Sequence, residues 1–179
     1  MLFRSPAFEV VIKTKRLDSF IEDANGAYDW CFMDQDYGLT EFGNSIDTVF
    51  FGRKSYELVL KENYTDYYKD LRQYVFSTTL RRLEDDSVTL INDDVLARVN
   101  NIKNAQGKNI WLFGGASLVS FFMKENLVDE LMLSVHPILL GSGKPLFENL
   151  DTRTQLKLTN SITYNSGLVQ LFYDVLKAE

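Results

Sequence analysis

The stretch that decides the fold is Asn109–Leu118, which reads NIWLFGGASL. Its segment Ile110–Phe113 is a short continuous apolar run, typical of a strand buried on both faces of a sheet. Gly114 and Gly115 follow, and from Ala116 onward apolar residues recur at helical spacing, so a helix is expected there. Backbone N–H groups at such a helix start can approach a phosphate closely, and the helix dipole favours the anion. The same residues also fit a tight turn that only packs the helix on its strand.

Composition places the chain among ordinary globular proteins. It has 179 residues, 45% hydrophobic and 25% charged, which predicts a single domain over residues 1–179 with a sizeable core. A net charge of −6 argues against general nucleic-acid binding, which needs a basic face. The only cysteine is Cys31 and the only histidine is His136, so a disulfide, a metal site and a histidine triad are not expected. With no membrane-length apolar run and no signal-peptide pattern, a cytoplasmic location is expected.

A second strand ends in glycine in the same way. Thr48–Phe51 is apolar, and it is followed by Gly52, Arg53, Lys54 and Ser55, after which a helix is expected over Lys54–Leu60. A third run, Gln73–Ser77, ends in hydroxyl residues, and a helix is expected over Val95–Asn104 after an acidic cap.

The remaining elements complete an α/β pattern. A helix is plausible over Asp34–Ile46, and a strand is expected over Glu130–Val135. We expect that strand to continue through residues 137–140 past Pro137, which suggests a bulge or an edge. Gln155–Tyr164 and Leu168–Tyr173 alternate about a turn and predict a hairpin. Alternating strands and helices that end in strands predict a mainly parallel sheet with an antiparallel C-terminal edge.

These strand ends suggest a ligand site. In an open α/β sheet, ligands bind outside the carboxyl ends of the strands. Arg53 and Lys54 would place cations beside the backbone donors of a helix start, and Ser55 could bond a phosphate oxygen. Two such corners suit a pyrophosphate between two nucleosides, although a merely solvated basic pair is the other interpretation. The sequence contains no GxGxxG or Walker motif, which disfavours a standard Rossmann domain or a P-loop NTPase.

At this point a family resemblance becomes visible. Thr48–Glu57 and Ile110–Leu118 resemble the two glycine segments of dihydrofolate reductases and of the reductase domain of bacterial riboflavin biosynthesis. Leu127–Leu131 and the block from His136 to Phe147 are similar to the riboflavin branch in particular, and the resemblance covers about residues 8 to 175. No deaminase-like segment precedes it, so a bifunctional riboflavin enzyme is not expected.

The resemblance implies a three-layer α/β/α dihydrofolate reductase-like fold and an NADPH-dependent reductase. Its phosphate-binding positions correspond to Gly52, Arg53, Lys54, Ser55, Gly114, Gly115, Ala116 and Ser117. Its adenosine side corresponds to Ser77 and Thr78, and Arg53, with Arg81, would select a 2′-phosphate. The nicotinamide would lie near Thr14 and the substrate near Trp30.

The implied reaction is hydride transfer to a C=N or C=O bond of a pterin- or aminopyrimidine-like heterocycle. The candidate acids are Asp18, which matches the aspartate of the riboflavin branch, and Asp34 or Asp36, which follow the tryptophan. Arg16 and Ser19 replace residues that are small in relatives. Either the substrate is anionic and Arg16 binds it, or the chain is an inactive nucleotide-binding or regulatory module.

Several of these residues have simpler interpretations. A tryptophan such as Trp30 is more often a core residue than a substrate wall, Asp34 and Asp36 suit a helix start, and His136 is expected to be structural. A homodimer is expected from the resemblance and from the proline-containing strand, taken as a sheet edge. A weaker hypothesis is an interaction domain whose partner surface contains Tyr64, Tyr67 and Tyr68.

Overall fold

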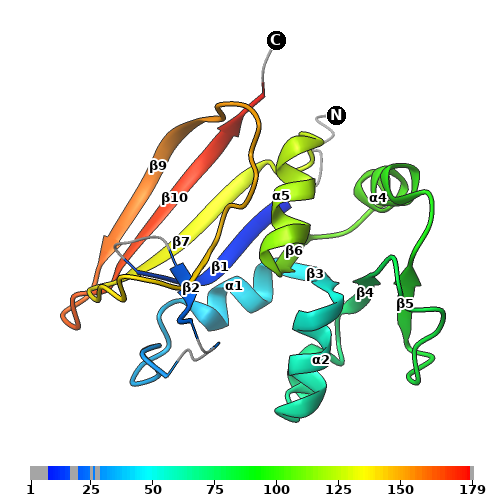
Figure 1. Cartoon of the computed structure of the whole chain (residues 1–179), viewed down its shortest axis with the longest axis horizontal. Coiled ribbons are helices and arrows are strands. Elements are labelled where there is room, and N and C mark those ends of the chain that lie inside the picture. The colour runs from blue at the N-terminus through cyan, green and yellow to red at the C-terminus, as the bar shows by residue number, and fades with distance from the viewer. Residues whose placement is uncertain (1–7, 17–19, 25, 27–28, 178–179) are drawn as a thin grey trace.

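The computed structural model describes residues 8–16, 20–24, 26 and 29–177, with only the backbone for residues 8–16. In this part of the chain eight strands form one sheet in the order β5-β4-β3-β6-β1-β7-β10-β9 (Figure 1). The strand bounds are β1 Phe8–Arg16, β3 Ile46–Gly52, β4 Arg72–Phe76, β5 Val88–Ile91, β6 Asn109–Gly114, β7 Glu130–His136, β9 Gln155–Thr163 and β10 Val169–Leu176.

The sheet is parallel from β5 through β7 and antiparallel at its C-terminal end. Parallel pairs join β5 to β4, β4 to β3, β3 to β6, β6 to β1, and β1 to β7. β10 runs antiparallel to β7 and to β9. The predicted mixed sheet and C-terminal hairpin are therefore confirmed. A small second sheet pairs β2 (Phe20–Glu22) with β8 (Lys144–Pro145).

Helices cover both faces, which gives three layers. The helices are α1 Leu39–Ser45, α2 Arg53–Lys61, α3 Thr65–Tyr68, α4 Val95–Asn104 and α5 Ala116–Lys124. Successive residues of β3 point to opposite faces. Phe50 packs with α4 and α5 residues such as Val99 and Phe122, whereas Phe51 packs with α2 and α3 residues such as Tyr56 and Tyr68. The continuous apolar runs of the sequence are thus explained by burial on both sides.

Three sequence-based expectations about these elements are wrong. The strand does not continue past Pro137, because the chain turns there and the N–H of Ile138 donates to the carbonyl oxygen of His136 at 2.8 Å. That strand is also not an edge, since β7 pairs with β1 on one side and β10 on the other. The helix expected over Asp34–Ile46 is only α1, because Ile46 already belongs to β3.

Candidate functional site

The two glycine corners lie side by side at the carboxyl edge of the sheet. β3 and β6 are parallel neighbours, and Phe51 is in register with Gly114. A Cβ atom on Gly52 would lie 3.1 Å from the carbonyl oxygen of Gly114, and one on Gly115 would lie 3.5 Å from Ser55 Oγ. Gly114 and Gly115 have φ angles of +114° and +47°, which side chains rarely adopt. The two corners therefore adjoin through bare backbone.

Two helix starts open onto this region. Gly52 is the N-cap of α2 and Gly115 is the N-cap of α5, and no side chain caps either helix. The first N–H groups of a helix have no partner within the helix, so they are available to an anion. No acidic residue stands in the first turn of either helix, and an acid there would compete with an anionic ligand.

The side chains beside the α2 corner are basic and polar. Lys54 is exposed and Ser55 is half-buried. Arg53 Nη1 lies 2.8 Å from Glu57 Oε1, one turn further along α2, in a pair that is largely exposed. Such an exposed pair is weak, so Arg53 remains available to a stronger anion.

The α5 corner has an acidic neighbour. Ala116 is buried, whereas Ser117 is exposed and its hydroxyl donates to Glu148 Oε2 at 3.5 Å. The N–H of Glu148 in turn donates to Ser120 Oγ at 3.0 Å, which anchors this segment on α5. The structure thus brings Ser117 to the corner, with a carboxylate close by.

The third strand end of the predicted site, that of β4, lies on the other side of β3 from β6. Gly52 is in register with Phe76 of β4, so Ser77 follows at the same edge of the sheet. Ser77 Oγ accepts hydrogen bonds from the N–H groups of Thr79 and Leu80, and this holds the turn. Thr78 and Arg81 are exposed nearby in the chain.

An aromatic group, formed by His136, Trp30 and Phe32, lies at the end of β7, which β1 separates from β6. His136 is 2% exposed, and its ring contacts Trp30 at 5.2 Å and Phe32 at 5.0 Å between centroids. The N–H of Phe32 donates to His136 Nε2 at 3.3 Å. His136 thus holds the segment that carries Trp30 near the sheet edge. Sequence analysis assigned it a structural role; its position at the end of a strand, directly before Pro137, was the signal that it lies at this edge.

The two candidate acids after the tryptophan have different environments. Asp36 accepts from the backbone N–H of Thr40 at 3.1 Å and from its hydroxyl at 2.9 Å, so it caps the start of α1. Asp34 is exposed and accepts from the hydroxyl of Tyr37 at 2.7 Å. Both acids are thus engaged by neighbours in their own segment, Asp34 by Tyr37 and Asp36 by Thr40 at the start of α1.

The rest of the predicted site lies beyond what the structure describes. Asp18 and Ser19 fall outside the described residues. Thr14 and Arg16 belong to β1, and Arg16 is in backbone register with His136. Their strand therefore ends beside the aromatic group.

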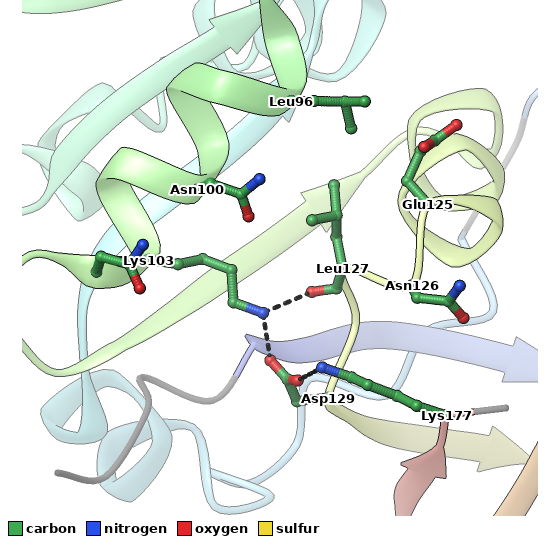
Figure 2. Close-up of a pocket in the computed structure, with 9 residues that line it drawn as sticks. Leu96, Asn100, Lys103, Glu125, Asn126, Leu127, Asp129 and Lys177 are labelled. Carbon is green, nitrogen blue, oxygen red and sulfur yellow. Dashed lines mark hydrogen bonds and ion pairs between the residues drawn. The ribbon is translucent and has the colours of Figure 1, made fainter. Parts of the chain in front are cut away.

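A separate pocket of about 410 Å³ lies at the other ends of the strands, away from the glycine corners, where β7 begins and α4 ends. Figure 2 shows the carboxylate of Asp129 between the ammonium groups of Lys103 and Lys177, at 2.8 and 2.7 Å. Burial lowers the pKa of Lys103 below 10.5, although Asp129 acts in the opposite direction. Asp129 thus joins α4 and the end of the chain to the start of β7.

Other site classes find no support in the described part of the chain. No group of three or more histidine, cysteine, aspartate or glutamate residues there could hold a metal ion. None of the described helices has the length and apolar character that crossing a bilayer requires. Tyr68 is 5% exposed, so it cannot form part of the partner surface suggested for it with Tyr64 and Tyr67.

Comparison with known proteins places this geometry in context. The model of the RibD C-terminal domain family matches residues 14–170. Uncharacterized protein YyaP of Bacillus subtilis (strain 168) is 46% identical over 168 residues, which cover 88% of this chain and 89% of that protein. Uncharacterized protein YwjB of the same organism is 38% identical over 162 residues, covering 88% and 91%.

Solved structures agree with the fold. A putative riboflavin biosynthesis protein from Shewanella sp. PV-4 has a TM-score of 0.81 at 27% identity, with 96% of this chain and 99% of that chain covered. Dihydrofolate reductase from Enterococcus faecalis, complexed with NADP(H) and RAB-propyl, has a TM-score of 0.69 at 11% identity, covering 98% and 100%. At that identity the second likeness concerns the fold alone. With a family match over most of its length and a reductase-like fold, this chain belongs to the RibD C-terminal domain family.

Proposed function

We propose that this chain is an NADPH-dependent reductase that transfers a hydride to a C=N or C=O bond of a small heterocycle of the pterin or aminopyrimidine kind. One observation carries the proposal: two uncapped helix starts meet in a single region of bare backbone at the carboxyl edge of the sheet. The membership of a family with reductase structural neighbours supports the reaction class.

The described residues fit such a cofactor. The two corners adjoin closely because Gly52 and Gly115 lack side chains, and a Cβ on either would reach the facing corner. The N–H groups at the starts of α2 and α5 would hold the pyrophosphate. Arg53 would exchange its weak pair with Glu57 for the 2′-phosphate.

The substrate would bind at the end of β7, beside the aromatic group. Trp30 and Phe32, held by His136, offer flat apolar surface that suits a heterocyclic ring. When bound, NADPH supplies the hydride from C4 of its nicotinamide. The substrate carbon gains that hydride, and its nitrogen or oxygen takes a proton from Asp34 or from a water that a carboxylate orients. Alignment alone can lower the barrier by roughly 7–11 kcal/mol.

The α2 corner can be tested with a variant that leaves the helix intact. Ser55→Asp places a carboxylate in the first turn of α2, where the dipole favours it but a phosphate would be repelled. Ala97→Asp is the matched control, because Ala97 is exposed at the equivalent position of α4. Binding is measured from cofactor fluorescence and from the melting temperature.

Wild-type protein should be stabilised by about 2.7 kcal/mol at a hundredfold excess of NADPH over its dissociation constant. Ser55→Asp should keep the ligand-free melting temperature and lose this stabilisation, whereas Ala97→Asp should keep both. Absence of any shift for wild-type protein at millimolar NADPH would refute cofactor binding. Binding without oxidation across dihydrofolate, aminopyrimidine and carbonyl substrates would favour the inactive nucleotide-binding module instead.

A further inference from the structure

Buried polar side chains gather on one face of the sheet, in contact with the segment that carries the aromatic group. Ser134, His136 and Gln170 are 6%, 2% and 2% exposed. Ser134 of β7 is in register with Gln170 of β10, and His136 follows two residues later on β7, so all three point to the same face. On that face Met132 packs in the apolar cluster that includes Phe42 of α1. The polar patch therefore continues this apolar face to the end of β7.

The side-chain amide of Gln170 makes three hydrogen bonds within this patch. Its Nε2 donates to the carbonyl oxygen of Tyr37 at 2.9 Å and to Ser134 Oγ at 3.2 Å. Its Oε1 accepts from the hydroxyl of Tyr164 at 2.8 Å. Apolar side chains of the same shape can replace such a buried network at little cost in stability, whereas a satisfied polar network fixes one arrangement of its members. The amide therefore indicates a positioning role.

Tyr37 is the residue that this amide fixes. Its φ angle is +50°, a left-handed conformation that bulky residues rarely adopt and that persists where the surroundings hold it. Gln170 binds its carbonyl oxygen, and its ring packs edge-on against that of Tyr164, with the centroids 4.8 Å apart. On its other side the ring of Tyr37 stacks with that of Phe32 at 6.5 Å. The hydroxyl of Tyr37 donates to Asp34 Oδ1 at 2.7 Å.

The segment that carries the aromatic group is thus attached to the sheet near both of its ends. Near its start, His136 Nε2 accepts from the N–H of Phe32. At its end, Gln170 donates to the carbonyl oxygen of Tyr37. The two anchors lie on the adjacent strands β7 and β10, so the placement of the segment follows that of the sheet.

We propose that Gln170 is a positioning residue for the substrate: by holding Tyr37 in its left-handed conformation, it sets Phe32 and Asp34 against the heterocycle. This inference rests on the proposed function, in which the aromatic group binds the ring and Asp34 is one of the proton sources. Gln170 acts through Tyr37, because its own side chain is buried in the face of the sheet. Loss of its amide should therefore weaken heterocycle binding and leave cofactor binding at the glycine corners as it is.

The test compares Gln170→Met, which keeps the unbranched side chain but not its amide, with Thr48→Val. Thr48 is also buried, and its hydroxyl donates to Asp47 near the start of β3, so the control removes a buried polar group away from the site. Binding of 7,8-dihydropterin and of NADPH is measured by fluorescence titration. Hydrogen exchange is followed at the amides of Phe32 and of Leu112, which lies on the interior strand β6.

Gln170→Met should raise the dissociation constant for 7,8-dihydropterin about tenfold, because the segment loses one of its two anchors. Exchange at Phe32 should accelerate at least about tenfold more than exchange at Leu112. NADPH binding should not change, and Thr48→Val should change neither ligand. Tyr164→Phe removes only the bond that orients the amide and should give the same selective change, about threefold, so it tests the proposal even where Gln170→Met does not fold.

Equal acceleration of exchange at Phe32 and Leu112 overturns the proposal, because the amide would then contribute only to global stability. Unchanged dihydropterin binding in both Gln170→Met and Tyr164→Phe overturns it as well. Wild-type protein that binds NADPH but no dihydropterin refutes the positioning of a heterocycle and leaves the cofactor assignment standing. Wild-type protein that binds no NADPH refutes the proposed function instead, and exchange at Phe32 then decides separately whether Gln170 holds the segment.

Discussion

Replacement of Arg53 by alanine should separate NADPH from NADH binding. The pair between Arg53 and Glu57 is an exposed contact within one helix, so breaking it costs about 0.3–0.5 kcal/mol. A charge-assisted hydrogen bond from the guanidinium to a 2′-phosphate contributes about 1.5–3 kcal/mol. The net loss on removing Arg53 is thus about 2 kcal/mol, which corresponds to a roughly thirtyfold higher dissociation constant for NADPH.

NADH lacks the 2′-phosphate, so its affinity should not change in the Arg53→Ala variant. Arg98→Ala is the matched control, because Arg98 forms a similar exposed pair with Asp93 at 2.8 Å on α4. Fluorescence titration of both cofactors against the three proteins measures the ratio directly, and thermal unfolding checks that each variant is folded. Equal weakening of NADPH and NADH, or no weakening of either, would refute the assignment of Arg53 to the 2′-phosphate.

Three further predictions concern stability. Asp129→Asn should lower the free energy of unfolding by about 2 kcal/mol, because it leaves the ammonium group of Lys103, whose side chain is 14% exposed, without its carboxylate. Lys177→Ala removes only a more exposed pair and should cost about 0.5 kcal/mol. Equal effects of the two substitutions in urea unfolding would contradict this. Burial raises the pKa of Asp47, but hydrogen bonds from its neighbours outweigh it and hold the pKa below 3.8. The stabilisation that Asp47 provides is therefore present above pH 3.8 and is lost as the pH falls through the lowered pKa. The free energy of unfolding of Asp47→Asn should therefore decrease less steeply with acid than that of the wild-type protein. Gly52→Ala should cost about 1 kcal/mol in thermal unfolding, since its Cβ would crowd a carbonyl oxygen at 3.1 Å; an unchanged melting temperature would show that the corner is loosely packed.

Local patterns were sufficient for most of the elements. The apolar runs that end at Gly52 and Gly114 became β3 and β6, and helices begin directly after them. Helix α4 has the predicted bounds, Val95–Asn104. These predictions succeed because burial of a strand on both faces and the start of a helix are each encoded within about ten neighbouring residues.

The errors arose where the outcome depended on distant residues. Residues 138–140 look like a strand, but Leu139 is 69% exposed because the chain turns after His136. Pro137 suggested that its strand is a sheet edge, yet β7 pairs with both β1 and β10. In both cases the local sequence permits two structures, and contacts that the pattern does not contain decide between them.

The sequence by itself determined the strands, the helix starts and the two glycine corners, because these follow from side-chain size and periodicity along the chain. Only the tertiary structure decided that the corners adjoin, that β7 is interior, and that β9 is the bare edge. The order of strands in a sheet is set by pairing between segments far apart in the chain, and the periodicity of a single strand carries no record of its neighbours.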